Sequence, residues 1–294
     1  FTKENMNTKV RGRKDLENLS IPLIGEIPQY FNTKKKLGFS KKTQPDIKAI
    51  VVKEGSRDII NEAFRVLRSN MDFMTNKDDK QNVFVITSFN PGSGKSFLSM
   101  NIAMSFAIKK KRILVIDGDL RHGTISSYVD SPQTGLSDYL GNRVDNYKDI
   151  IVEDKKYDNL HIIPIGTVPP NPTELLENGK LAILIEALGS EYDYIFIDCP
   201  PIDIVADTQI IEKQADRTIF VIRSGLLDRS MLTELEYIYQ EKRFKNLCVI
   251  LNGTEVGGRY NYHYSYRYGY HNGYSSYYGN EKLADCGEGG GVNG

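Results

Sequence analysis

VFVITSFNPGSGKS, residues 83–96, joins a strongly apolar run to a turn that ends in Gly94-Lys95-Ser96, and a helical pattern follows over Lys95–Ile108. A strand, a turn and a helix in this order bring backbone N–H groups and the positive end of the helix together, where they bind phosphate. Lys95 would neutralise phosphate charge, and the Ser96 hydroxyl would ligate Mg²⁺. The segment predicts an ATP site with contacts from Asn90, Pro91, Gly92, Ser93, Gly94, Lys95, Ser96 and Phe97. The pattern GxxxxGK[ST] is not fully met, because Phe89 stands where its first glycine belongs.

Three aspartates are expected beside this loop. Asp117 and Asp198 each end an apolar run, and Asp119 follows the first of them by two residues. The carboxyl ends of parallel strands lie along one edge of an open sheet, where ligands bind, so these carboxylates should lie near Lys95. There they could hold Mg²⁺ or accept a proton from an attacking hydroxyl group. Asp117 or Asp198 alone could equally be a helix cap or a turn residue, but the three together favour a nucleotide site.

Residues from about 55 to 253 alternate short β-branched runs with longer helical patterns. This alternation is typical of βαβ units and predicts an α/β fold with a doubly wound, mostly parallel sheet, buried on both faces. The expected strands are Val83–Thr87, Ile113–Asp117, Leu160–Pro164, Tyr194–Asp198, Thr218–Ile222 and Leu247–Leu251. The expected helices are Lys95–Ile108, Pro172–Leu188 and Arg229–Lys242.

The two ends of the chain differ in composition from this central domain, which we place at residues 51–256. Residues 1–50 are basic and irregular; the first 48 carry 11 Lys and Arg against 5 Asp and Glu, although the whole chain has no net charge. Residues 257–294 are rich in Gly, Tyr, Asn and Ser, and we expect them to form a flexible, disordered tail. The three separated cysteines fit a reducing cytoplasm, and no apolar run approaches the ~20 residues that a membrane span needs. The first residue is not Met, so the chain is expected to be a piece of a longer protein.

Tyrosines recur at nearly every second position of the tail. They are Tyr260, Tyr262, Tyr264, Tyr266, Tyr268, Tyr270, Tyr274, Tyr277 and Tyr278. Alternate side chains of an extended peptide share one face, so successive positions would present a similar acceptor to an active site. The segment alone could also be an aromatic low-complexity region that merely associates. Its presence beside an ATP site favours a substrate role.

Several motifs resemble those of the bacterial tyrosine kinases (BY-kinases) of capsule and exopolysaccharide systems. ITSFNPGSGKS (86–96), LVIDGDLRHG (114–123) and YIFIDCPP (194–201) resemble the family's Walker A, Walker A′ and Walker B motifs. Further likenesses are the EX2RX2R pattern of Glu62, Arg65 and Arg68, PPNPTELL (169–176), the juxtamembrane stretch LSIPLIGEIP (19–28) and the tyrosine-rich tail. The resemblance covers nearly the whole chain. It implies a deviant Walker phosphate-loop fold of the MinD/ParA-like type and ATP- and Mg²⁺-dependent protein-tyrosine autokinase activity.

Two departures from the family pattern concern the loops. Ser93 replaces a common Glu, and Gly123 replaces a frequent Pro after the Walker A′ arginine. The alternative identity is a MinD/ParA-like regulatory ATPase or assembly scaffold without kinase activity. Those proteins carry a signature lysine at the position of Asn90 and lack a tyrosine tail, so both features favour the kinase.

The resemblance also suggests roles for the site residues. The loop and Lys95 would hold the β- and γ-phosphates, and Ser96 with Asp117 and Asp198 would hold Mg²⁺. Asp117 or Asp119 would act as the base toward the tyrosine hydroxyl, and the division of roles among the three aspartates stays open.

Two more residues are candidates for the nucleotide site because of their side-chain chemistry. Arg121 could stabilise charge during transfer, or could only form a salt bridge beside Asp119. Asn252 could read the adenine, or could be a turn residue before Gly253.

Glu62, Arg65 and Arg68 lie at i+3 spacing on a predicted helix. Spacing alone favours a solvated face with local ion pairs. The resemblance implies instead that this stripe contacts the nucleotide site of a neighbouring subunit, in a homo-oligomeric ring such as an octamer. Each tail would then be phosphorylated by the adjacent protomer.

The resemblance finally implies partners and a location. We expect a membrane polysaccharide co-polymerase part, either upstream or on a partner chain, and a tyrosine phosphatase. The basic segment 1–50 would be a juxtamembrane arm at the cytoplasmic face of the bacterial inner membrane, where Lys and Arg are in excess. A nucleic-acid-binding arm is less favoured because the segment has few interleaved aromatic residues, so no nucleic acid partner is expected.

Overall fold

An eight-stranded sheet forms the centre of the fold in the computed structural model, which describes residues 8–30, 49–75, 82–202 and 206–255. The strands are β1 (Leu23–Pro28), β2 (Val83–Thr87), β3 (Ile113–Asp117), β4 (Val152–Glu153), β5 (Leu160–Ile163), β6 (Tyr194–Asp198), β7 (Arg217–Arg223) and β8 (Cys248–Thr254). Their order across the sheet is β1-β8-β7-β2-β6-β3-β5-β4. All neighbouring strands are parallel except β4, which is antiparallel to β5. This confirms the predicted mostly parallel sheet.

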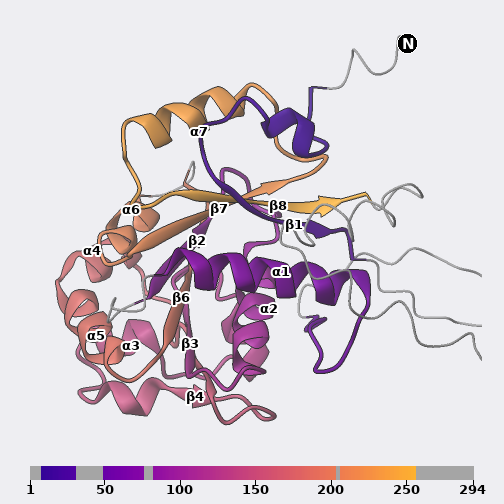
Figure 1. Ribbon diagram of the computed structural model, residues 1–294. Coiled ribbons are helices and arrows are strands. Elements are labelled where there is room, and N and C mark those ends of the chain that lie inside the picture. Colours follow the sequence, from indigo (N-terminus) through magenta and orange to yellow (C-terminus); the bar gives the residue numbers. More distant parts are fainter. Residues whose placement is uncertain (1–7, 31–48, 76–81, 203–205, 256–294) are drawn as a thin grey trace, which may run out of the picture. The chain divides into compact units, whose positions relative to one another are not determined.

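Helices cover both faces of the sheet (Figure 1). The helices are α1 (Ile59–Met74), α2 (Lys95–Ala107), α3 (Leu136–Leu140), α4 (Pro172–Glu177), α5 (Lys180–Gly189), α6 (Asp207–Glu212) and α7 (Met231–Gln240), with short 3-10 turns at Arg13–Leu16, Ser126–Val129 and Tyr147–Ile150. Helices α1 and α2 lie on one face, and Phe106 of α2 packs against Tyr194 and Phe196 there. Helices α3 to α7 pack on the other face through two apolar clusters. The doubly wound architecture is therefore confirmed.

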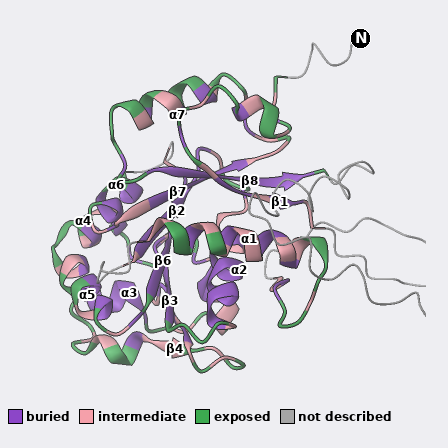
Figure 2. Ribbon diagram, in the orientation of Figure 1, coloured by how far each residue is buried: buried purple, intermediate pink, exposed green. Residues whose placement is uncertain are grey.

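The central strands are buried on both faces, as their continuous apolar sequences predict. Every residue of β2, β3 and β6 is buried, and Figure 2 shows the sheet as the most buried layer of the structure. No helix in the described ranges has the length and hydropathy that a membrane span requires. The described elements belong to one unit that runs to Glu255, and the predicted tyrosine tail lies outside the described residues.

Two local predictions are wrong. The expectation of an irregular segment over residues 1–50 fails for Leu23–Pro28, which forms β1 and pairs in parallel with β8. Glycine lets α1 approach this strand closely, because a Cβ at Gly25 would lie 2.7 Å from Cδ1 of Leu67 and that side chain would have to shift. The single helix expected over Pro172–Leu188 is divided into α4 and α5 by Gly179, whose φ of +83° favours glycine.

The buried Asn101 side chain fastens the segment before α1 to helix α2. Its Oδ1 accepts from the backbone N–H groups of Val51 and Val52 at 2.7 and 3.2 Å. Its Nδ2 donates to the carbonyl oxygens of Ala49 and Phe97 at 3.0 and 2.8 Å. One side chain thus bonds four backbone groups, and three of them lie in the segment before α1, outside any helix or strand.

Asn101→Ala should lower the free energy of unfolding by about 2–4 kcal/mol, because it leaves buried backbone donors without acceptors. Urea denaturation of the full chain measures this loss. Asn70→Ala is a matched control, since the Asn70 side chain donates to the carbonyl of Ile24 as its one hydrogen bond to a described residue, and its loss should cost about 1 kcal/mol. Equal losses for the two variants would show that Asn101 does not hold this segment.

Candidate nucleotide site

The predicted phosphate loop connects β2 to α2 at the carboxyl edge of the sheet. Gly94 precedes the first residue of α2, Lys95, with a left-handed φ of 89°. A Cβ at Gly94 would lie 2.3 Å from Nδ2 of Asn252, so only glycine fits. The backbone N–H groups at the start of α2 therefore remain open to an anion, as the sequence predicts.

Hydrogen bonds from side chains hold the loop in shape. The hydroxyls of Ser88 and Ser93 both donate to the carbonyl of Asn90, at 2.8 Å each. Asn252 Nδ2 donates to the Ser93 carbonyl at 2.9 Å. Asn252 is buried within β8, so its interpretation as a turn residue is wrong. Ser93, which replaces a Glu common in the family, has a structural role here, because its buried hydroxyl bonds the carbonyl of Asn90 within the loop.

Phe89 occupies the place of the missing first glycine and points into the core. Its side chain is 2% exposed, and its ring lies edge-on to Phe220 of β7 with 4.8 Å between centroids. The side chain thus packs into the apolar cluster that covers β7 and β8. The departure from the textual pattern therefore adds a buried core side chain and not one exposed at the loop surface.

Asp198 ties the end of β6 to the first turns of α2. The Ser96 hydroxyl donates to Asp198 Oδ2 at 2.5 Å, and the Ser99 hydroxyl donates to Oδ1 at 3.0 Å. Asp117 is the direct neighbour of Asp198 in the register of β3 and β6. The structure therefore brings together Ser96, Asp117 and Asp198, the three residues predicted to hold the metal.

Asp117 is fully buried and has one satisfied oxygen. Its Oδ2 accepts from both the backbone N–H and the hydroxyl of Ser126, at 2.7 Å each. Its Oδ1 is buried and has no hydrogen-bond partner within the described part of the chain. An unpaired buried carboxylate oxygen is costly unless a ligand supplies a donor or a cation.

Burial raises the pKa of the carboxyl groups of Asp117 and Asp198. It raises the pKa of Asp117 to about 7, with further increases from the charges of Asp198 and Asp119, against the opposing hydrogen bonds from Ser126. It raises the pKa of Asp198 to about 6, although Ser96 and the Lys95 ammonium oppose the shift. Burial also lowers the pKa of Lys95, and the carboxylates of Asp198 and Asp119 oppose that change. The site is thus a buried cluster in which a bound cation would favour ionised aspartates.

Asp119 lies in the turn after β3 and is partly accessible, with 13% of its side chain exposed. It accepts from the backbone N–H groups of Arg121 and His122 at 3.3 Å each, and from Nδ1 of His122 at 3.2 Å. The predicted alternative of a salt bridge for Arg121 is confirmed, but the partner of its side chain is Asp207 and not Asp119. Arg121 instead donates through Nε to buried Asp207 at 3.2 Å and through Nη2 to Thr173 at 3.3 Å.

Three further residues of the site, Ser99, Ser126 and Arg223, carry no motif that predicts them from the sequence. The half-buried Arg223 ends β7, and its Nη1 lies 3.5 Å from the position that a Cβ of Gly94 would take. Burial lowers its pKa, and no carboxylate pairs with it within the described ranges. The sequence signal that could have identified Arg223 is a basic residue at the carboxyl end of a predicted strand. A guanidinium without an acidic partner beside a phosphate loop suits an anionic ligand.

The residues present fit Mg²⁺ bound together with a nucleotide. The described ranges contain no group of three or more His, Cys, Asp or Glu that could hold a metal by itself. Mg²⁺ usually takes one or two carboxylates and completes its shell with water and substrate phosphates. The orphaned Asp117 Oδ1 and the Ser96 hydroxyl beside Asp198 supply such a partial set.

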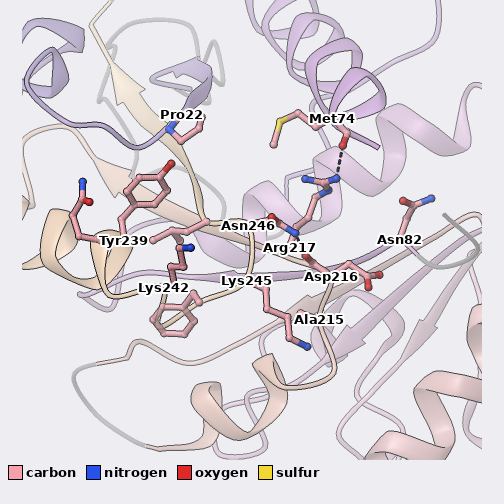
Figure 3. A pocket seen from close by; sticks show the side chains of 13 residues that line it. Pro22, Met74, Asn82, Ala215, Asp216, Arg217, Tyr239, Lys242, Lys245 and Asn246 are labelled. Atoms are coloured by element: carbon pink, nitrogen blue, oxygen red, sulfur yellow. Dashed lines mark hydrogen bonds between the residues drawn. The ribbon is translucent and has the colours of Figure 1, made fainter. Parts of the chain in front are cut away.

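A cavity of about 1090 Å³ lies at the opposite, amino-terminal edge of the sheet (Figure 3). Its lining includes Asn82, Arg217 and Leu247, which stand at the starts of β2, β7 and β8. Arg217 donates to the carbonyl of Met74 across it. This cavity is separate from the nucleotide site.

The parallel sheet, the loop that opens α2 and the aspartates at the strand ends define a phosphate-loop nucleotide-binding protein. A family model described as an AAA domain matches residues 81–235. The chain is 37% identical over 193 residues to the tyrosine-protein kinase CpsD of Streptococcus agalactiae serotype III, covering 65% of this chain and 81% of that protein.

Solved structures agree with this result. The kinase domain of the Escherichia coli tyrosine kinase ETK superposes with a TM-score of 0.72 at 28% identity, covering 84% of this chain and 96% of that one. The BceF tyrosine kinase domain superposes with a TM-score of 0.69 at 32% identity, covering 83% and 99%. The chain belongs to the bacterial tyrosine kinase family.

Asp117→Asn should stabilise the nucleotide-free protein at high pH. Because the folded-state pKa of Asp117 is about 7 and its ordinary value is 3.8, the folded state retains a proton that the unfolded chain releases between those values. Stability from this group therefore falls as pH rises through that window. Without Mg²⁺ or nucleotide, the variant should gain about 1–3 kcal/mol at pH 8 and less at pH 5.

Denaturant unfolding at the two pH values measures this difference. Asp145→Asn, which changes an exposed carboxyl, should have little effect at either pH. The same change in stability at pH 5 and pH 8 for Asp117→Asn would contradict the prediction.

Proposed function

We propose that this protein is an ATP-dependent tyrosine autokinase that phosphorylates the C-terminal tyrosine cluster of a neighbouring subunit. The observation that supports this most is the convergence of Lys95, Asp117, Asp119 and Asp198 at the loop between β2 and α2, in a chain of the bacterial tyrosine kinase family. The acceptor tyrosines lie in residues 260–278, outside the described ranges.

The burial of the three aspartates suggests how their roles divide. Asp117 and Asp198 are enclosed and adjacent, which suits the metal side of the site, where Mg²⁺ would neutralise charge on the phosphate oxygens. Asp119 is the more accessible carboxylate and lies two residues after Asp117, beyond the end of β3. We assign Asp119 as the base. The tyrosine oxygen bonds to the γ-phosphorus, the bond to the ADP oxygen breaks, and the hydroxyl proton passes to Asp119.

The cationic side chains would hold the nucleotide. Lys95 and the loop amides would bind the β- and γ-phosphates, and Arg223 would add positive charge on the flank formed by β7 and β8. Asn252 lies on the same flank and would contact the adenine. Arg121 is bound to Asp207 and Thr173, so it would reach transferred charge only by exchanging those partners.

Incubation with ATP and Mg²⁺ should produce phosphotyrosine in residues 260–278, detected by mass spectrometry. Lys95→Met should reduce it at least 100-fold, because the variant loses the cation that holds the transferred phosphate. Lys109→Met changes an exposed lysine just after the same helix and should leave phosphorylation unchanged. An unmodified tail on wild-type protein that binds ATP would reject the kinase and favour the regulatory ATPase or scaffold.

We also propose that the exposed side of α1 forms the contact between subunits. Arg65 forms an ion pair with Glu62 and donates to the Ser56 carbonyl at 2.7 Å, with both charged groups near the surface. Phe73, on the same helix, is 91% exposed, which is unusual for a large apolar side chain. Arg68 points the other way and donates to the Ser105 carbonyl of α2 at 2.7 Å, so it would support the interface from within the subunit.

Reversing the charge of Glu62 and removing the exposed ring of Phe73, in the double variant Glu62→Arg with Phe73→Ser, should disrupt this assembly. Tail phosphorylation should fall about tenfold at low protein concentration, since each site would lose its neighbour's tail. Light scattering measures the mass, and mass spectrometry measures the phosphotyrosine. Glu186→Arg alters an exposed glutamate on α5 and should change neither result. Unchanged mass in the double variant would place the interface elsewhere.

The basic N-terminal arm and the tyrosine tail suggest how the protein acts in the cell. We propose that the basic arm places the domain at the cytoplasmic face of the inner membrane, beside a polysaccharide co-polymerase part in the same or a partner chain. Each phosphotyrosine adds about −1.5 to −2 charges, which would repel the tails from acidic sites and loosen the ring. A tyrosine phosphatase would reverse this change, and the cycle would regulate capsular or exopolysaccharide polymerisation and export.

A further inference from the structure

We propose that Ser126 is a positioning residue of the phosphoryl-transfer site, which fixes the Asp117 carboxylate so that only Oδ1 remains available to Mg²⁺. This inference rests on the proposed function for the identity of the reaction. Its structural basis, however, is the set of contacts between the turn after β3 and the end of that strand.

Ser126 is held in one orientation by three hydrogen bonds. Its backbone N–H and its hydroxyl both donate to Asp117 Oδ2, at 2.7 Å each. The same hydroxyl oxygen accepts from the backbone N–H of Ile165 at 2.8 Å. A hydroxyl group has a single proton, so with Ile165 as its donor the proton of Ser126 is committed to Asp117. Ser126 is 3% exposed, and water has little access to this arrangement.

Gly123 shapes the turn that brings Ser126 back to Asp117. Its φ of +61° lies in the left-handed region, which the ring of proline cannot adopt. A Cβ at Gly123 would also lie 2.8 Å from Cδ1 of Ile165 and 3.6 Å from the Ser126 hydroxyl oxygen. The glycine that replaces a frequent proline in this loop therefore has a consequence for Asp117.

These contacts leave the two carboxylate oxygens of Asp117 unequal. Oδ2 is occupied by two donors, whereas Oδ1 is buried and has no partner within the described residues. Without Ser126 the carboxylate could rotate and both oxygens would need new partners. Groups that orient a metal ligand typically change metal affinity about 10- to 100-fold when they are removed.

Mg²⁺-dependent binding of a fluorescent ADP analogue to the full chain tests this proposal. For Ser126→Ala we expect the half-saturating Mg²⁺ concentration to rise about tenfold, while analogue affinity in EDTA stays within about twofold of wild type. Ser126→Thr retains the hydroxyl and should restore most of the Mg²⁺ response. Ser127→Ala is the matched control, because the Ser127 hydroxyl bonds the Thr124 carbonyl in the same turn and does not contact Asp117.

Gly123→Ala provides a second route if Ser126→Ala does not fold, since strain at this φ displaces Ser126 without removing it. It should weaken the Mg²⁺ response in the same direction. A Ser126→Ala protein with a wild-type Mg²⁺ response, or with equal losses in EDTA and in Mg²⁺, would overturn the proposal. Failure of the kinase proposal would be distinguishable. If the wild-type tail stayed unphosphorylated while Ser126→Ala still weakened the Mg²⁺ response, the kinase would be rejected and the positioning role of Ser126 retained.

Discussion

Two hydroxyl groups at the start of α2 donate to a single carboxylate, Asp198, at the end of β6. These hydrogen bonds join the helix that presents the phosphate loop to the strand beside it, so the N-terminus of α2 has a fixed place over the sheet edge. Asp117 is in register with Asp198 on the next strand. The phosphate loop therefore leads directly into this junction, and Asp117 stands beside it.

Much of the fold followed from apolar runs, because strands buried on both faces show continuous hydrophobic sequences. Strand β1 could not be predicted in this way, since Gly25 and Pro28 interrupt its apolar residues and are typical of turns. The advantage of a glycine at position 25 becomes visible only when Leu67 of α1 packs against it. The break between α4 and α5 had a local signal in Gly179, but the apolar periodicity on both sides concealed it.

The candidate site was predictable to the extent that motifs mark it. Glycines, a lysine and aspartates at strand ends have special conformations or charges, and they were identified. Ser99 and Ser126 are ordinary polar residues whose importance arises from contacts 99 and 9 positions away in sequence. The partner of Arg121 could not be inferred for the same reason, since Asp207 lies 86 residues further on and is brought near by α6.

Phe89 connects the phosphate loop to the beginning of the chain. Its ring belongs to an apolar cluster that also contains Val10, Leu16 and Ile21, all from the N-terminal segment. That segment and the loop therefore pack on the same apolar cluster, and close-packed side chains transmit strain. Phe89 is therefore the packed side chain through which a displacement of the N-terminal segment would reach the base of the phosphate loop.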